Sequence, residues 1–131
     1  MANKAILCVD DEKIILNSLK SQLRKNFGPA YMYEMAENAE EAMEVIEKLV
    51  AGGVEILIIV SDWLMPGIKG DEFLIQVHKR FPRIVKVMLT GQANEEAVRR
   101  ATDEADLFAH ISKPWNEDDL VNVIRTGLER L

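Results

Sequence analysis

The stretch Ile56-Leu57-Ile58-Ile59-Val60-Ser61-Asp62-Trp63-Leu64-Met65-Pro66-Gly67 decides the fold. It begins with five consecutive apolar residues, mostly β-branched, reaches an acid at Asp62, and then turns at Pro66 and Gly67. A short apolar run of this kind predicts a strand buried on both faces, which is typical of parallel sheets covered by helices. Open α/β sheets keep their functional sites at the carboxyl ends of such strands. Asp62 is therefore the first candidate functional residue.

Outward from this stretch, strand and helix patterns alternate along the chain. Apolar runs predict further strands at residues 5–9, 31–36, 84–89 and 107–111, the second of them weaker and at an edge. Helical spacing of apolar residues predicts helices at 12–27 and 71–81 and after three capping asparagines, Asn38, Asn94 and Asn116. Alternation of this kind predicts an α/β fold with a single doubly wound, five-stranded parallel sheet and helices on both faces.

Composition narrows the classes of function. A length of 131 residues suits one domain, which we place at residues 1–131 with no output domain inside it. The net charge of −6 argues against direct nucleic-acid binding, and no apolar run is long enough to cross a membrane. The first residues do not resemble a signal peptide, and Cys8 is the single cysteine, so we expect a cytoplasmic protein.

Polar side chains follow four of the predicted strands. Asp10 and Asp11 come after the first, Asp62 after the third, Thr90 after the fourth and Lys113 after the fifth. Because parallel strands end at the same edge of a sheet, these residues are expected to converge there. Three carboxylates and one ammonium give that edge a formal charge of −2, and clustered carboxylates at close range repel one another.

A cluster of carboxylates without histidine or cysteine suits a hard divalent cation, either Mg²⁺ or Mn²⁺. Magnesium often holds a phosphate as well, and a carboxylate such as Asp62 can accept a phosphoryl group as an aspartyl phosphate. In that interpretation Lys113 supplies a positive charge to the phosphoryl oxygens, Thr90 a hydroxyl donor, and Gly91 the space for the group.

Four blocks together resemble the receiver domain of two-component response regulators, the CheY-like superfamily. Each block alone is a weak indication, but all four occur in the family's order and spacing across the chain. They are Ile6-Leu7-Cys8-Val9-Asp10-Asp11-Glu12, Ser61-Asp62-Trp63-Leu64-Met65-Pro66-Gly67 with Gly70, Met88-Leu89-Thr90-Gly91, and Ser112-Lys113-Pro114.

This resemblance implies a flavodoxin-like sheet of strand order 2-1-3-4-5. It implies that Asp62 is the phosphoacceptor, that Asp10 and Asp11 hold the metal together with Asp62 and the backbone carbonyl of Leu64, and that Thr90 and Lys113 sense the phosphoryl group. The protein is then a signalling phosphoacceptor and not an enzyme acting on other substrates.

The resemblance also implies partners. A sensor histidine kinase or a phosphotransfer protein supplies the phosphoryl group from a phosphohistidine. A downstream effector or a fused output domain meets the face formed by the fourth helix, fifth strand and fifth helix, and a phosphorylation-dependent homodimer is compatible with this scheme. Neither nucleic acid nor membrane is expected to bind directly.

One position departs from the family pattern. The aromatic residue that accompanies the threonine in the switch usually lies three residues before the lysine, where this chain has His110. Phe108 lies two residues earlier and is expected to face the same side of the strand. The predicted switch residues are therefore Thr90, His110 and Phe108.

Other functions remain as alternatives. A nucleotide-binding enzyme needs a glycine-rich loop after the first strand, where this chain has acids, and those acids would also repel the phosphate of a flavin mononucleotide. A metal-dependent phosphohydrolase with an aspartyl nucleophile normally has a second acid two residues after that nucleophile, where Leu64 stands here. A receiver-like binding module that is never phosphorylated is the third alternative.

Overall fold

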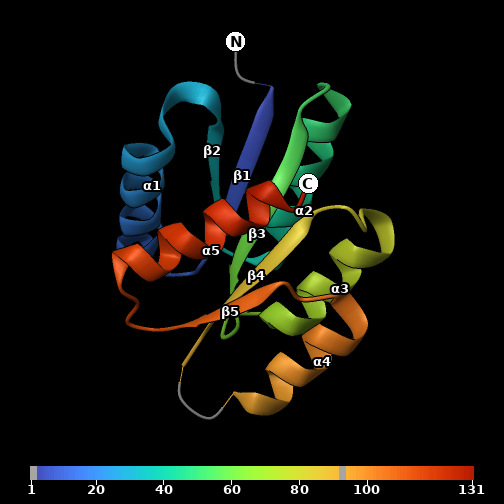
Figure 1. Cartoon of the computed structure of the whole chain (residues 1–131). Helices are drawn as coiled ribbons and strands as arrows, with labels where there is room; N and C mark the ends of the chain where they lie inside the picture. The colour runs from blue at the N-terminus through green and yellow to red at the C-terminus, as the bar shows by residue number, and fades with distance from the viewer. Residues whose placement is uncertain (1–2, 92–93) are drawn as a thin grey trace.

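Strands and helices alternate strictly in the computed structural model, which describes residues 3–91 and 94–131 (Figure 1). The elements are β1 (Lys4–Val9), α1 (Lys13–Phe27), a 3₁₀ turn (Gly28–Ala30), β2 (Met32–Ala36), α2 (Ala39–Ala51), β3 (Glu55–Asp62), α3 (Gly70–Arg80), β4 (Val85–Thr90), α4 (Glu95–Ala105), β5 (Ala109–Ser112) and α5 (Glu117–Glu129). No helix in the described ranges is long and apolar enough to cross a bilayer.

The five strands form one parallel sheet in the order β2-β1-β3-β4-β5, which confirms the predicted fold. β3 lies at its centre, and seven of its eight residues are buried, as the continuous apolar run from Ile56 predicted. β2 lies at an edge and is only partly buried, in agreement with its weaker pattern. Because the strands are parallel, all their carboxyl ends lie along one edge of the sheet.

Helices cover both faces of the sheet and enclose two apolar clusters. Side chains from α2, α3 and α4 pack against one face, where Phe73 and Leu74 are fully buried. Side chains from α1 and α5 pack against the other, where Leu19 and Leu120 are fully buried. Both clusters hold the strands in a fixed register, so the residues at the strand ends are placed by rigid elements.

Candidate functional site

Three carboxylates meet at the carboxyl edge of the sheet. Asp10 follows β1 directly and Asp62 is the last residue of β3, while Asp11 lies next to Asp10. Each offers a carboxylate oxygen, and the three oxygens lie within 4.8 Å of one another. Asp10 is fully buried and Asp62 nearly so, whereas Asp11 is exposed. The Glu12 backbone N–H donates a 2.9 Å hydrogen bond to Asp10 Oδ1 and orients that carboxylate.

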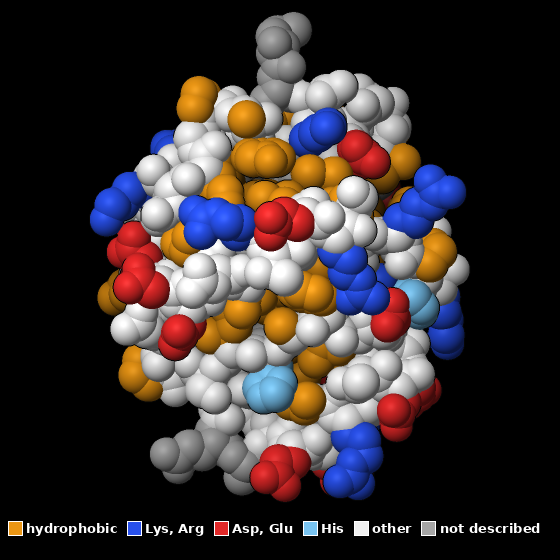
Figure 2. All heavy atoms as spheres, in the orientation of Figure 1, with side chains coloured by type: hydrophobic (Ala, Val, Ile, Leu, Met, Phe, Trp, Pro, Cys, Tyr) orange, Lys and Arg blue, Asp and Glu red, His pale blue; other side chains and the backbone are white. Residues whose placement is uncertain are grey.

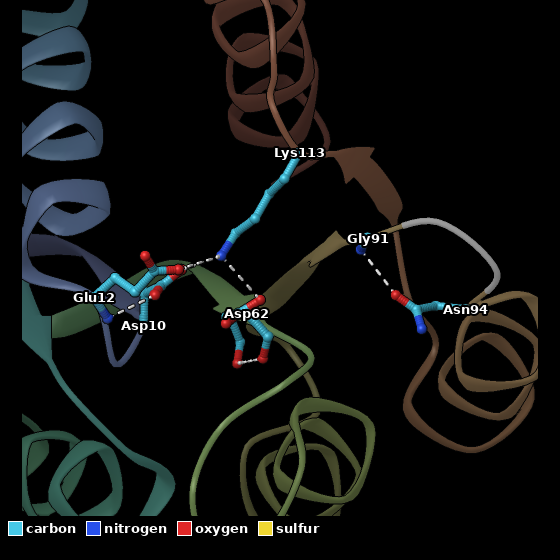
Figure 3. Close-up of polar contacts among 7 residues, drawn as sticks. Asp10, Glu12, Asp62, Gly91, Asn94 and Lys113 are labelled. Carbon is cyan, nitrogen blue, oxygen red and sulfur yellow. Dashed lines mark hydrogen bonds and ion pairs between the residues drawn. The ribbon is translucent and has the colours of Figure 1, made fainter.

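Lys113 joins two of these acids from the end of β5 (Figure 3). Its Nζ lies 2.8 Å from Asp10 Oδ2 and 3.2 Å from Asp62 Oδ1, and 4.0 Å from Glu12 Oε1. Its backbone N–H donates to the carbonyl of Thr90 at 2.8 Å, which ties the residue to the end of β4. Burial lowers the pKa of Lys113, but the hydrogen bonds and charges of Asp10 and Asp62 outweigh this and raise it above the ordinary value.

Asp62 has an unusual environment for a carboxylate. Burial and the charge of Asp10 raise its pKa to about 6, although Lys113 acts in the opposite direction and Asp11 adds a smaller increase. Such a shift is typical of a functional site that concentrates like charges.

A cavity of about 490 Å³ opens over these groups and is lined by Asp62, Lys113, Leu64, Gly91 and other residues of the strand ends. Thr90, the last residue of β4, is buried, and its carbonyl accepts the Lys113 N–H, although the residue lines a different cavity. The structure therefore brings together the carboxylates, the lysine and the threonine end of β4, which the sequence predicted from four separate segments.

Gly70 closes the loop that follows β3. Its N–H donates a 2.8 Å hydrogen bond to the carbonyl of Trp63, and a Cβ atom at this position would lie 2.2 Å from the carbonyl oxygen of Asp62. Only glycine permits this approach. The loop carrying Leu64 is thereby folded back against the strand that carries Asp62.

The donor set fits a hard divalent cation. Asp10, Asp11 and Asp62 provide carboxylate oxygens at mutual distances that one ion can span, and the excess negative charge favours a cation. Oxygen ligands of this kind suit Mg²⁺ or Mn²⁺ better than a soft metal. The chemistry of the cluster is thus compatible with the predicted cofactor.

The two predicted switch residues with ring side chains, His110 and Phe108, lie in different environments. His110 is exposed on β5 and lines a second cavity, of about 500 Å³, together with Thr90 and Val98. Phe108 precedes β5 and packs instead in the cluster beneath α5, with the Arg130 guanidinium 5.2 Å from its ring. The prediction that Phe108 faces the same side as His110 was wrong, because strand alternation does not extend to a residue before the strand.

Two of the three predicted asparagine caps form as expected. Asn38 and Asn116 each accept a 2.8 Å hydrogen bond from the first turn of the helix that follows. Asn94 precedes α4 but caps it with no side-chain hydrogen bond, since its Oδ1 accepts from the Gly91 N–H at 2.8 Å. Sequence reasoning missed this contact, although an asparagine three residues after a strand-end glycine could have suggested it.

A family model described as the response regulator receiver domain matches residues 6–125. The chain belongs to this family. Receiver domains are the phosphoacceptor modules of two-component signalling, and the acidic cluster of this receiver lies where the sequence blocks predicted.

Curated relatives of the receiver include two kinds of signalling protein. The hydrogenase transcriptional regulatory protein HoxA of Cupriavidus necator is 29% identical over 95% of this chain, and the sensor kinase CckA of Brucella abortus is 28% identical over 95%. The chain spans 24% and 12% of the lengths of these two proteins. The match is therefore to one module of each longer relative.

Solved structures agree with this assignment. A CheY-like response regulator receiver domain protein from Methanospirillum hungatei is 32% identical, with a TM-score of 0.84 over 98% of this chain and 96% of the other. A receiver domain protein from Clostridium thermocellum is 25% identical, with a TM-score of 0.85 over 99% and 96%. The same overall fold thus recurs at 25–32% sequence identity.

Proposed function

We propose that this receiver takes a phosphoryl group from the phosphohistidine of a sensor histidine kinase or a phosphotransfer protein onto Asp62, with residues 1–131 acting as one receiver module. The observation that carries the proposal is the position of Lys113 Nζ, which bonds Asp10 at 2.8 Å and Asp62 at 3.2 Å at the edge of a cavity. A lysine placed between carboxylates at a strand edge, beside a buried threonine, suits the charge distribution of phosphoryl transfer.

The transfer is a single displacement at phosphorus. A carboxylate oxygen of Asp62 attacks, a new P–O bond forms, and the P–N bond to the donor imidazole breaks, with the electron pair staying on the imidazole nitrogen. Lys113 holds its positive charge against the incoming phosphoryl oxygens, and the hydroxyl of Thr90 offers a further donor. When held by Asp10, Asp11, Asp62 and the Leu64 carbonyl, Mg²⁺ or Mn²⁺ supplies the positive charge that offsets the carboxylates and the phosphoryl group.

Intact-mass analysis after incubation with acetyl phosphate and Mg²⁺ tests the phosphoacceptor. We expect the wild type to gain one phosphoryl group and the Asp62→Asn variant to gain none, because the amide is a poor nucleophile. Asp103→Asn, at an exposed position on α4, is the matched control and should be labelled like the wild type. Labelling of Asp62→Asn to the wild-type extent would contradict the assignment.

The same incubation separates the receiver from its alternatives. Leu64, at the position of the second acid of an aspartyl phosphohydrolase, is apolar and 61% exposed, so no side chain there can protonate a leaving group. We expect label to accumulate to at most one group per chain, with slow release of phosphate. Many turnovers per minute would favour a phosphohydrolase, and no labelling at all would favour a binding module.

The signal is proposed to leave through α4, β5 and α5 towards an effector or a fused output domain. Thr90 and His110 line one cavity beside α4, so a change at Thr90 reaches the surface of β5 over a short path. Figure 2 shows the face that α5 covers, where apolar side chains are visible between charged ones. A mixed surface of this kind suits a reversible protein contact.

A further inference from the structure

Three helices at the site edge of the sheet begin with an asparagine, and one of these residues differs from the other two. Asn38 and Asn116 have extended backbones, with ψ of 172° and 137°, and their Oδ1 atoms accept from the N–H groups of Glu41 and Asp118. Asn94 has ψ of 29°, and its side chain accepts no hydrogen bond from the first turn of α4, which lies wholly within the described range 94–131. The chain itself thus shows the capped geometry that Asn94 lacks.

The amide oxygen of Asn94 is used elsewhere. It accepts the Gly91 N–H at 2.8 Å, as Figure 3 shows beside Asp62 and Lys113. Gly91 and Asn94 both line the cavity of about 490 Å³ that Asp62 and Lys113 also line. Gly91 and Asn94 therefore form part of the wall of the space that a phosphoryl group on Asp62 would enter.

A phosphoryl oxygen is a stronger acceptor than a neutral amide oxygen, because its negative charge strengthens the hydrogen bond. We propose that Asn94 is a positioning residue with two alternative bonds: it holds the Gly91 N–H while Asp62 is unmodified, and it caps α4 when a phosphoryl oxygen takes that N–H. The inference rests on the proposed function, since it requires a phosphoryl group on Asp62.

The exchange of bonds gives α4 a direct link to the site. Once released, Asn94 rotates about ψ into the extended region that Asn38 and Asn116 occupy, and its Oδ1 accepts from the N–H of Ala97 in the first turn of α4. Gly91 and Asn94 also line the second cavity, next to His110. A local change of hydrogen-bond partner at Gly91 is thereby converted into a change at the start of α4 and beside β5.

Amide hydrogen exchange measured by NMR tests the capped state in the wild type. Beryllium fluoride with Mg²⁺ serves as a stable analogue of the phosphoryl group. On saturation we expect exchange of the Ala97 N–H to slow by about fivefold, the effect of a typical helix cap. In Asn94→Ala, which has no side-chain acceptor, the same addition should leave Ala97 exchange unchanged. Unchanged Ala97 exchange in the saturated wild type would overturn the proposal.

Affinity for the analogue tests the unmodified state. Serine is a good helix cap but its side chain is one atom shorter, so Asn94→Ser keeps an acceptor for α4 and loses the bond to Gly91. We expect this variant to bind beryllium fluoride about two- to tenfold more tightly than the wild type, because the competing bond is gone. Asn38→Ser is the matched control on α2 and should bind like the wild type. Equal or weaker binding by Asn94→Ser would contradict the competition.

These outcomes are distinct from failure of the proposed function. If acetyl phosphate does not label Asp62 in the wild type, the phosphoacceptor assignment itself fails. If Asp62 is labelled normally but Asn94→Ser binds the analogue like the wild type, only the role of Asn94 fails. Thermal unfolding of each variant, followed by circular dichroism, confirms that the compared proteins are folded at the temperature of the titration.

Discussion

Lys86, the second residue of β4, places its ammonium in the core, and the residue is only 1% exposed. Its Nζ lies 2.7 Å from the carbonyl oxygen of Ile84, 2.9 Å from His78 Nδ1 and 3.3 Å from the carbonyl oxygen of Pro82. Burial lowers the pKa of Lys86 to about 8, although the charge of Asp106 acts in the opposite direction. Burial and the neighbouring Lys86 also lower the pKa of His78, so the imidazole accepts from the ammonium as a neutral ring.

This lysine makes stability depend on pH in a defined window. Between a folded pKa of about 8 and the ordinary value of 10.5, the unfolded chain binds more protons than the folded chain, so the free energy of unfolding rises with pH. Lys86→Met has a similar volume and no ammonium. The unfolding free energy of the wild type relative to this variant should be constant below pH 8 and rise by about 3 kcal/mol towards pH 10.5.

Urea unfolding at a series of pH values measures this difference. Lys48→Met, at an exposed position on α2, is the control, and its difference from the wild type should stay flat. Burial and the charge of Lys86 lower the pKa of the neighbouring His78, so this histidine changes charge below the window. A flat difference for Lys86→Met would show that the ammonium is better solvated than its burial indicates.

At the scale of the elements, the sequence was sufficient to predict which residues meet at the carboxyl edge of the parallel sheet. Asp10, Asp62 and Lys113 could be predicted to meet because each follows a buried apolar run, and parallel strands end at one edge. Helix starts were also predictable from capping asparagines in α2 and α5. Both predictions depend on local pattern and on one rule of topology.

Contacts that depend on three-dimensional packing could not be predicted in this way. The Asn94 Oδ1 can accept either from an N–H group in the first turn of α4 or from the Gly91 N–H. The local sequence favours the helix cap, whereas the structure shows the bond to Gly91. Phe108 was assigned a face from an alternation that starts one residue later. Lys86 lies within the predicted strand at 84–89, but its partner His78 lies on another element, α3, so this contact has no signal in the local sequence.

The α3–α4 pair shows the same limit and gives a prediction of its own. Arg100 on α4 bonds two acids of α3, with Nη1 3.2 Å from Asp71 Oδ2 and Nη2 2.7 Å from Glu72 Oε1, and its Nε lies 3.4 Å from Glu104. The Asp71 side chain is only 12% exposed, so loss of its cation leaves a largely buried charge. Arg100→Met should therefore lower the free energy of unfolding by more than the loss of an ordinary exposed ion pair.

Chemical denaturation at low and high salt distinguishes this ion pair from lost packing. The destabilisation of Arg100→Met should shrink at high salt, where the exposed part of the cluster is screened. Glu104→Gln removes only the pair within α4, whose side chains are 40% and 56% exposed, and should cost about 0.3–0.5 kcal/mol. If both variants lose the same stability, the bridge between the helices contributes nothing beyond an ordinary surface pair.

At the scale of the whole molecule, the fold concentrates negative charge at one edge of the sheet. Both apolar clusters fix the strands, and the strand ends then hold Asp10, Asp11 and Asp62 together with Lys113 beside them. Burial first, and then the charge of Asp10, raise the pKa of Asp62 to about 6. The stability of the entire chain should therefore respond to a cation that binds only the folded state.

The Asp11→Asn variant distinguishes the destabilising repulsion of this charge from its contribution to cation binding. Asp11 is exposed, so its replacement disturbs no packing, and it removes one of three like charges. Without divalent ions the variant should be as stable as the wild type or more stable by up to about 1 kcal/mol, because repulsion is relieved. With Mg²⁺ at about 100 times its Kd, the wild type should gain about 2.7 kcal/mol and the variant clearly less at the same concentration.

Thermal unfolding with Mg²⁺ and with a chelator measures both effects, and Asp103→Asn should follow the wild type in each. An equal gain in Asp11→Asn would mean that the ion binds without this carboxylate, and a loss of stability without Mg²⁺ would mean that Asp11 contributes to the fold and not to a strained charge cluster.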